Sequence, residues 1–149
     1  MRKNIKSYGI ENDQNLKLLI ALTRTTQAVH KRSGNIFEQG GLTTAQFSVL
    51  EALYHKGEMT ISEIMKTILS TPGNMTVVIK NLEKEKHITK KENPEDKRAT
   101  LIRITEKGNK LIENIFPKHI KDLEDCFSTL SSEEKENIIK LLKKLTRKP

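Results

Sequence analysis

The chain has 149 residues, a formal net charge of +8 and a sequence pI near 9.6. The length suits one compact domain, and the apolar runs are too short for a membrane-spanning helix. The N-terminus shows no signal-peptide pattern, and one cysteine excludes an internal disulfide. We therefore expect a cytoplasmic protein whose positive charge favours a polyanionic partner, above all nucleic acid.

The first predicted element is one long helix. Between Asp13 and Phe37, apolar and small residues recur every three or four positions, as they do on one face of a helix. Gly40 and Gly41 end the pattern. A single helix of this length is not stable without a surface to pack on, so it needs a partner.

Two short helices are predicted next. Thr43 and Gln46 have the spacing of a capping box at the start of the first, and Thr60 and Glu63 repeat it at the start of the second. The predicted buried faces are Phe47, Leu50 and Leu53 in the first helix, and Ile61, Ile64, Met65 and Ile68 in the second.

A third short helix follows. Ser70 or Thr71 is expected to cap it, and Pro72 suits a first turn, where no backbone N–H is needed. Its predicted buried face is Met75, Val78, Ile79 and Leu82. The opposite face carries groups that can hydrogen-bond base edges or touch a thymine methyl group, namely Gly73, Asn74, Thr76, Val77 and Lys80. An ordinary amphipathic helix has the same pattern, but the order of the surrounding elements favours a DNA-reading helix.

The chain then changes to strand periodicity. The segments HITKK and ATLIRI predict a β-hairpin with a long charged loop between them. The loop carries Asp96, Lys97 and Arg98. An arginine on a narrow ribbon can enter the minor groove of DNA, and Asp96 is placed to brace either that arginine or the loop backbone. The alternative is a solvated charged turn.

Two more helices complete the chain. Thr105 is expected to open the first, which should be kinked at Pro117, and its predicted apolar stripe is Leu111, Ile115 or Phe116, Ile120, Leu123 and Phe127. Ser131 and Glu134 form a capping box before the last. The apolar stripes at 19–36 and 138–145 have no evident partner within one chain, which favours a homodimer.

The predicted fold class is mainly α with a small β-hairpin: a winged helix-turn-helix with N- and C-terminal dimerisation helices. The predicted domain covers residues 13–145. Within it, 42–104 form the DNA-binding lobe, and 13–38 and 105–146 form the dimerisation helices. In such a fold the third short helix enters the major groove, and the hairpin lies along the backbone or minor groove.

Four segments together resemble the MarR family of winged-helix transcription regulators: GLTTAQFSVLEAL, TISEI, NLEKEKHITK and NPEDKRATLIRITEKG. The resemblance spans about residues 15–145. It implies a homodimer on a pseudo-palindromic operator in double-stranded DNA, usually a repressor, released by a small phenolic molecule or by cysteine oxidation. It places the recognition helix at 72–86 and the wing at 92–99. The DNA-contacting positions that the resemblance implies are Thr71, Gly73, Asn74, Thr76, Val77, Lys80 and Arg98. The predicted DNA-binding residues also include Ser70 before the helix and Asp96 and Lys97 in the wing loop.

The sequence departs from the family pattern at three informative places. Just before the wing, an arginine that is common in the family is replaced by Lys90 or Lys91, which keeps the charge but loses the planar fork of donors. Many members carry arginine where this chain has Val77, which argues against direct guanine reading there. Many carry glycine where Lys86 stands, so a left-handed Lys86 would be slightly strained.

The resemblance also directs attention to an effector. Phe37, Phe47 and Tyr54 lie near the expected junction of the dimerisation and DNA-binding parts, where a phenolic or quinone-like ligand is predicted. Cys126 is either a redox sensor or, more commonly for such a residue, a small buried apolar side chain. The histidines lack metal-ligand spacing, so no metal or other cofactor is predicted.

Two other classes of protein remain open. A winged-helix module that binds only protein would share the fold but would not need the wing arginine. An enzyme is less expected, because no phosphate-binding glycine loop or nucleophile elbow is present, although a site can be assembled from distant positions. We expect no enzymatic activity.

Overall fold

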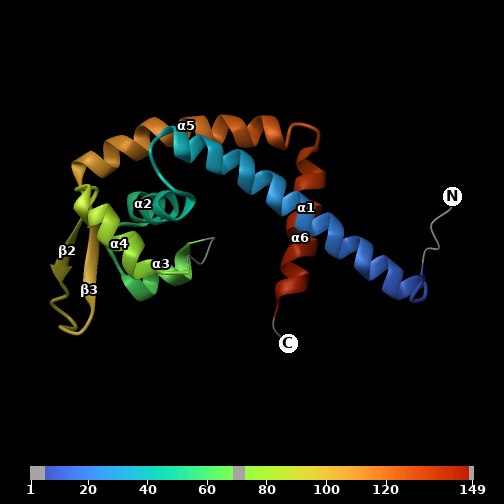
Figure 1. The fold of residues 1–149 in the computed structure, drawn as a ribbon, viewed down its shortest axis with the longest axis horizontal. Helices are drawn as coiled ribbons and strands as arrows, with labels where there is room; N and C mark the ends of the chain where they lie inside the picture. Colours follow the sequence, from blue (N-terminus) through green and yellow to red (C-terminus); the bar gives the residue numbers. More distant parts are fainter. Residues whose placement is uncertain (1–5, 69–72, 148–149) are drawn as a thin grey trace.

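The computed structural model describes residues 6–68 and 73–147. Its described residues form six helices and three short strands (Figure 1). The helices are α1 (Ile10–Gln39), α2 (Thr44–Lys56), α3 (Ile61–Thr67), α4 (Met75–Lys84), α5 (Glu106–Cys126) and α6 (Ser132–Thr146). The strands are β1 (Met59–Thr60), β2 (Ile88–Glu92) and β3 (Thr100–Ile104). The predicted fold class, mainly α with a small hairpin in a winged arrangement, is confirmed.

Helix α1 is longer than predicted. It has 30 residues, which corresponds to a length of about 45 Å. Just after its end, Gly41 has a φ of 85°, a backbone conformation that favours glycine. Only Ser33 and Phe37, both in its C-terminal half, are buried. The N-terminal half extends away from the rest of the molecule (Figure 1).

Side-chain caps start the helices largely as predicted. The capping boxes Thr43–Gln46 and Ser131–Glu134 are both complete. At α3 the Thr60 hydroxyl accepts from the Glu63 N–H at 3.2 Å, but it also donates to the Glu63 carboxylate at 3.1 Å. Glu63 therefore binds the Thr60 side chain, so α3 has a capping residue without the reciprocal half of the box.

The start of α4 differs from the prediction. Its N-cap is Asn74, whose side-chain oxygen accepts from the Val77 N–H at 3.3 Å. The helix therefore spans 75–84 rather than 72–86. The residues predicted to cap and open it, Ser70, Thr71 and Pro72, lie outside the described residues.

One hydrophobic core joins α2, α3, α4, the sheet and the first half of α5. Its fully buried large side chains are Val49, Leu50, Leu53, Ile64, Ile79, Leu82, Ile88, Ile102, Ile112 and Ile115. Two predicted core residues are instead exposed: Met65 at 44% and Ile120 at 51%. Met65 lies beside the buried face of α3. On α5, the buried face passes through His119 rather than through Ile120.

The sheet contains one more strand than predicted. Its order is β1-β3-β2, and both pairings are antiparallel. The pair Met59–Thr60 adds to the far side of β3, where Met59 lies opposite Ile102. Two residues are too few to show strand periodicity in a sequence.

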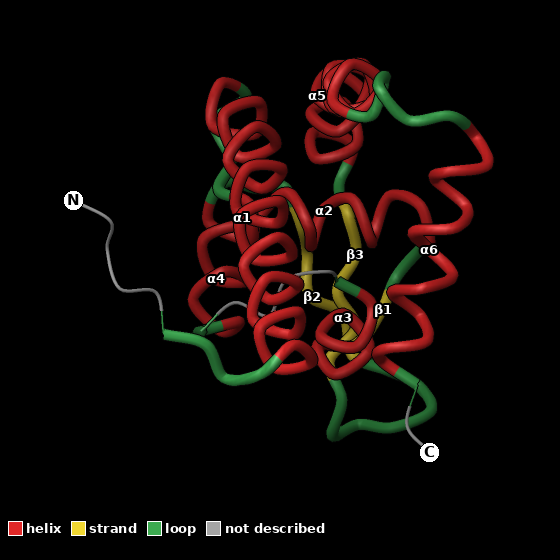
Figure 2. Tube along the Cα trace, turned by 90° about the vertical axis from the view of Figure 1, so that its right-hand side faces the viewer, coloured by secondary structure: helices red, strands yellow, loops and turns green. Residues whose placement is uncertain are grey.

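Helices α5 and α6 lead away from this core. Helix α5 continues through Pro117 as one helix of 21 residues, and its ribbon is curved (Figure 1). Helix α6 crosses α1 in Figure 1 but lies well apart from it in the turned view of Figure 2. No residue of α6 is buried. Across 6–68 and 73–147, no helix has the length and apolarity needed to cross a bilayer.

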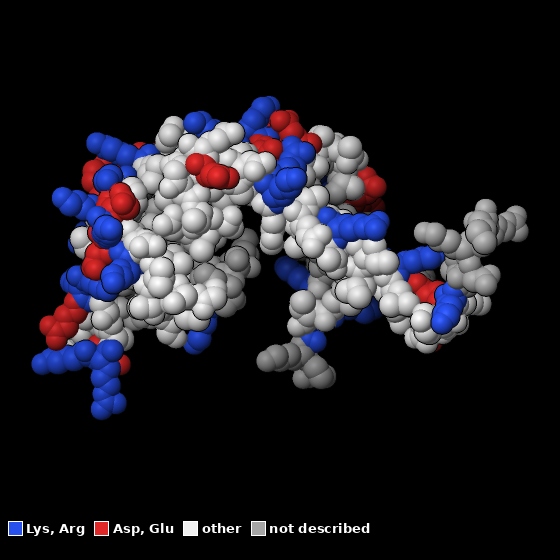
Figure 3. All heavy atoms as spheres, in the orientation of Figure 1, with Lys and Arg blue, Asp and Glu red and all other residues white. Residues whose placement is uncertain are grey.

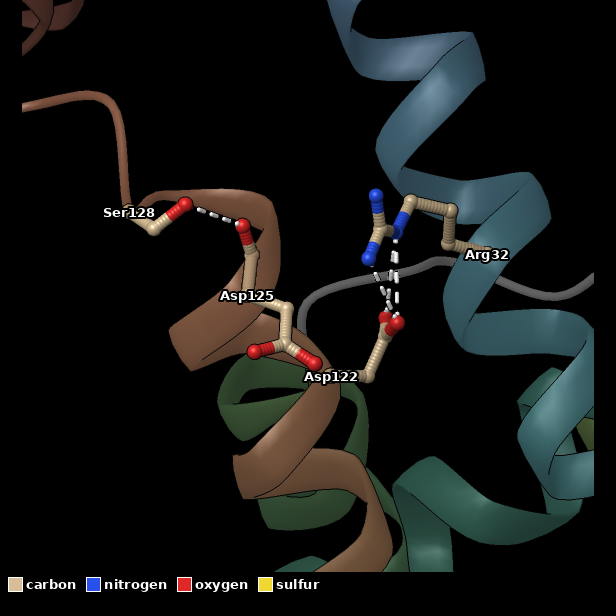
Figure 4. A network of polar contacts seen from close by, with 4 residues as sticks. All are labelled: Arg32, Asp122, Asp125 and Ser128. Atoms are coloured by element: carbon tan, nitrogen blue, oxygen red, sulfur yellow. Dashed lines mark hydrogen bonds and ion pairs between the residues drawn. The ribbon is translucent and has the colours of Figure 1, made fainter.

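Helices α1 and α5 are joined by an ion pair. The Arg32 guanidinium donates to the Asp122 carboxylate, with the shortest N···O distance 2.8 Å (Figure 4). Figure 4 also shows the Ser128 hydroxyl donating to the Asp125 carbonyl just after α5 ends. The pair links the long helix α1 to α5, the helix that leads away from the core.

Candidate nucleic-acid interface

Helix α4 presents a polar face to solvent. Met75, Ile79 and Leu82 hold it against the core. On its other face Thr76, Val77 and Lys80 are exposed, and Gly73 and Asn74 before the helix are exposed as well. Val77 is 47% exposed, which is unusual for valine and leaves its methyl groups free to meet a thymine methyl.

Asn74 has a structural role that the sequence did not predict. Its Oδ1 caps α4 by accepting from the Val77 N–H. A cap of this kind stabilises a helix by about 1 kcal/mol. The cap uses only the oxygen, so the Nδ2 group of Asn74 can still donate to a base or phosphate.

The wing loop is held by turns that use acidic and amide side chains. The Asp96 carboxylate accepts from the Arg98 N–H at 3.0 Å, and the Asp96 carbonyl accepts from the Ala99 N–H at 3.1 Å. Asn93 similarly accepts from the Glu95 N–H at 3.0 Å. Asp96 thus braces the loop backbone, which was one of the two roles considered for it, while the Arg98 side chain stays exposed.

Positive side chains gather on the wing. Figure 3 shows lysines and arginines projecting from the tip and the outer side of the hairpin. On the sheet, Thr89 lies opposite Arg103 and Lys91 lies opposite Leu101, so Lys91 and Arg103 share the outer face. Arg103 was not among the predicted contacts, although alternation along β3 points it outward.

The wing and α4 are also joined to each other. Lys90 faces inward on β2, and its ammonium lies 3.6 Å from the Glu83 carboxylate on α4. Between the two elements, Lys86 adopts a left-handed conformation with φ 63°. The left-handed conformation considered for this position is confirmed, and such a conformation typically costs a residue with a side chain about 1 kcal/mol.

The three predicted effector residues belong to one aromatic cluster. Phe37 of α1 and Phe47 of α2 stack with ring centroids 3.8 Å apart. His119 of α5 packs edge-on against both, at 5.0 and 5.5 Å. The cluster continues through Phe116 and His55 to Tyr54.

Within this cluster Tyr54 and His55 are exposed to solvent, whereas the two stacked phenylalanines are buried. Phe37 and Phe47 are each 4% exposed, so a ligand reaches them only if α1, α2 and α5 move apart. Burial lowers the pKa of His119, while the nearby carboxylates of Asp122 and Glu51 oppose that shift. His119 is thus neutral at pH 7, as suits a core side chain.

A separate groove of about 590 Å³ lies between the C-terminal half of α1 and the start of α2. It contains none of the three predicted effector residues. Its lining is Lys31, Gly34, Asn35, Glu38, Gly41, Leu42, Thr43, Thr44 and Gln46.

Cys126 is the last residue of α5 and is half-buried. Among the described residues, no group of three or more His, Cys, Asp or Glu side chains is placed to hold a metal ion.

The geometry defines a class of protein. A helix with an exposed polar face follows two short helices, and a basic hairpin stands beside it, which is the winged helix-turn-helix arrangement.

Comparison with known proteins identifies the family. Residues 31–115 match the family described as transcriptional regulator SarA/Rot. The HTH-type transcriptional regulator MhqR of Bacillus subtilis is 36% identical over 133 residues, covering 89% of this chain and 92% of MhqR. The chain belongs to the MarR family of winged helix-turn-helix transcription regulators.

Two solved structures illustrate the shared fold. A variant of MarR from E. coli complexed with operator DNA has a TM-score of 0.80 at 22% identity, covering 93% of this chain and 100% of that one. BpsR from Bordetella bronchiseptica has a TM-score of 0.77 at 24% identity, covering 99% of this chain and 100% of that one. The DNA binding of BpsR is regulated by 6-hydroxynicotinic acid.

Proposed function

We propose that this protein is a cytoplasmic, non-enzymatic transcription regulator that binds a pseudo-palindromic operator as a homodimer and acts as a repressor. Helix α4 enters the major groove, and the wing places Arg98 in the flanking minor groove. The two half-sites lie about one helical turn, roughly 34–36 Å, apart. The residues that contact DNA are Ser70, Thr71, Gly73, Asn74, Thr76, Val77, Lys80, Asp96, Lys97 and Arg98.

One observation supports this proposal most directly. The exposed face of α4 and the basic wing are joined by the contact between Glu83 and Lys90. They therefore form one positively charged unit instead of two unrelated surfaces. A winged-helix module that binds only protein has no need for a braced loop with an exposed Arg98.

The experiment is a salt titration of operator binding. The operator is selected from genomic fragments by the wild-type protein. Lys80→Ala is expected to reduce the slope of log K against log salt by about one unit, because one phosphate contact is lost. Lys118→Ala, an exposed charge change on α5, is the matched control and should leave the slope unchanged.

Base reading is tested at Asn74 with the helix cap preserved. Asn74→Ser keeps an oxygen that caps α4 but removes the amide donor. It should relax base preference at a single operator position and leave the salt slope intact. If Lys80→Ala and Asn74→Ser weaken every sequence equally with unchanged slopes, the assignment of reading and anchoring positions is wrong.

The homodimer is proposed from exposed apolar surface at both ends of the chain. The stripe on α6 consists of Ile138, Leu141, Leu142 and Leu145, which are between 41% and 62% exposed. On α1, the large exposed apolar residues are Ile10, Leu16, Leu18, Leu19 and Ile20. Surfaces of this extent on a small protein mark an interface, and a second copy of the chain offers matching surfaces under twofold symmetry.

Sedimentation at micromolar concentration is expected to give a dimer. Leu142→Glu should dissociate it, because a carboxylate would be buried at the interface without a partner. Lys140→Glu, on the opposite face of α6, also reverses charge but should leave the dimer intact. A folded wild-type monomer at micromolar concentration would refute the proposal.

An effector is proposed to act by shifting the dimer between two states. A phenolic or quinone-like ligand near Phe37, Phe47 and Tyr54 would favour a dimer whose recognition helices no longer match the operator. The buried stacking of Phe37 on Phe47 means that the ligand must open the junction of α1, α2 and α5.

The effector is tested by titrating phenols, salicylates and quinones into the operator complex. Weakened operator binding is the expected result, and no change across the panel would count against it. A quinone effect that disappears in Cys126→Ser would assign oxidant sensing to Cys126 instead.

A further inference from the structure

The start of α5 is tied to the chain that leaves α4. The Thr105 N–H donates to the His87 carbonyl at 3.0 Å, and the Thr105 hydroxyl donates to the Lys86 carbonyl at 2.7 Å. The same hydroxyl accepts from the Gly108 N–H at 3.1 Å and so caps α5. One residue thus begins α5 and binds two consecutive carbonyl groups beyond α4.

Lys107 extends this junction to the end of α4 itself. Its ammonium donates to the carbonyl of Glu85 at 2.8 Å, across 22 positions of sequence. Glu85 is the C-cap of α4. Carbonyl groups at a helix C-terminus lack helical partners and carry the negative end of the helix dipole, so a cation there is stabilising.

We propose that Lys107 is a positioning residue for DNA recognition, which rests on the function proposed above. Its ammonium sets the orientation of α4 relative to α5. Helix α4 has only 10 residues, and the chain after it turns through the left-handed Lys86. A short helix followed by a strained turn needs a contact with another element to hold its orientation. Base reading tolerates only small displacements of the residues that support the recognition helix.

The position of this tie has a consequence for the dimer. Helix α5 leads directly from the junction toward the end of the molecule that carries α6 (Figure 1). Lys107 therefore fixes the orientation of each recognition helix relative to α5. Helix α5 belongs to the dimerisation part, which sets the spacing of the two half-sites. Contacts to phosphate alone do not require this orientation, because non-specific binding tolerates many poses.

The experiment compares three variants on two duplexes. The duplexes are an operator selected by the wild-type protein and a scrambled duplex of the same length. Lys107→Met keeps the aliphatic stem and removes the donor. Lys110→Met makes the same charge change one turn further along α5, and Lys107→Arg restores a cationic donor. Thermal unfolding and the salt slope are measured for each protein.

We expect Lys107→Met to weaken operator binding about tenfold, or ~1.4 kcal/mol. Its affinity for the scrambled duplex and its salt slope should match those of Lys110→Met, and Lys107→Arg should recover most of the operator affinity. Equal losses on both duplexes, or a salt slope reduced relative to Lys110→Met, would make Lys107 a phosphate contact and overturn the positioning role. So would a lower unfolding temperature with an unchanged operator preference. A wild-type protein without preference for any selected duplex would instead refute the proposed function.

Discussion

Gly108→Ala is expected to lower the free energy of unfolding by about 2 kcal/mol, as over-packing of a closed contact typically does. A methyl group at this position would overlap the carbonyl oxygen of His87 and would lie 2.7 Å from Cγ1 of Ile104. The carbonyl cannot yield alone, because it also accepts from the Thr105 N–H. Relief of the overlap therefore requires α5 and the start of β2 to separate.

Gly34→Ala provides the matched control. Gly34 is also helical, but its nearest neighbour would be the Thr44 hydroxyl at 3.5 Å, an ordinary contact. Alanine there should raise stability by about 0.5–1 kcal/mol, because glycine loses more backbone entropy in a helix. Urea unfolding at one fixed protomer concentration measures both variants, since dimer stability depends on concentration. A gain in stability for Gly108→Ala, like the one expected for Gly34→Ala, would show that the close approach at Gly108 is unimportant.

Arg98→Ala is expected to weaken operator binding tenfold or more, about 1.4 kcal/mol. The side chain is exposed at the wing tip, so its removal should leave the fold and the dimer intact. Arg98→Lys should recover only part of the affinity, because an ammonium is more strongly hydrated than a guanidinium and fits a narrow minor groove less well. Fluorescence anisotropy with the selected operator at fixed salt measures all three proteins, and unchanged affinity for Arg98→Ala would refute the role of the wing.

The sign of the effect at Asp96 separates bracing from simple electrostatics. Asp96→Ala removes the acceptor of the Arg98 N–H and should weaken operator binding, although it also removes a charge that repels phosphate. Asp96→Asn keeps an acceptor oxygen and removes the same charge, so it should bind at least as tightly as the wild type. Tighter binding by Asp96→Ala would show that the loop is only a solvated turn.

Much of this architecture could be predicted because its signals are local. Thr43 with Gln46, and Ser131 with Glu134, fix helix starts through contacts three residues apart. The change from helical to strand periodicity after residue 87 likewise marks the start of the wing. Such short-range patterns survive in a sequence without any knowledge of tertiary contacts.

The predictions from the sequence were wrong where tertiary contacts determine the local structure. Asn74 caps α4, although Ser70 and Thr71, four and three positions earlier, also have side chains that can cap a helix. β1 exists only because β3 offers it an edge. On α5, the junction with α1 and α2 buries His119 against Phe37 and Phe47 in place of Ile120. In each of these cases the local structure is determined by the neighbouring elements rather than by the sequence of the segment itself.

The candidate interface was predicted residue by residue on α4 and the wing, but the residues that position it were not. Lys107 looked like part of an ordinary helix start. Its contact with Glu85 depends on how the wing folds the chain back, and no spacing in the sequence encodes it. The same holds for Lys90 and Glu83, which are brought together by the hairpin.

The strand order has a consequence for colloidal behaviour. With the order β1-β3-β2, the sheet has two edge strands. The longer of them is β2, whose sequence is ITKKE. An unpaired edge strand can recruit a strand from another molecule and begin aggregation, and lysines at the edge oppose such recruitment. The adjacent lysines of β2 thus protect the unbound protein at high concentration, whether or not they touch a phosphate. Neutralising them would favour precipitation, which would be easily mistaken for a loss of function.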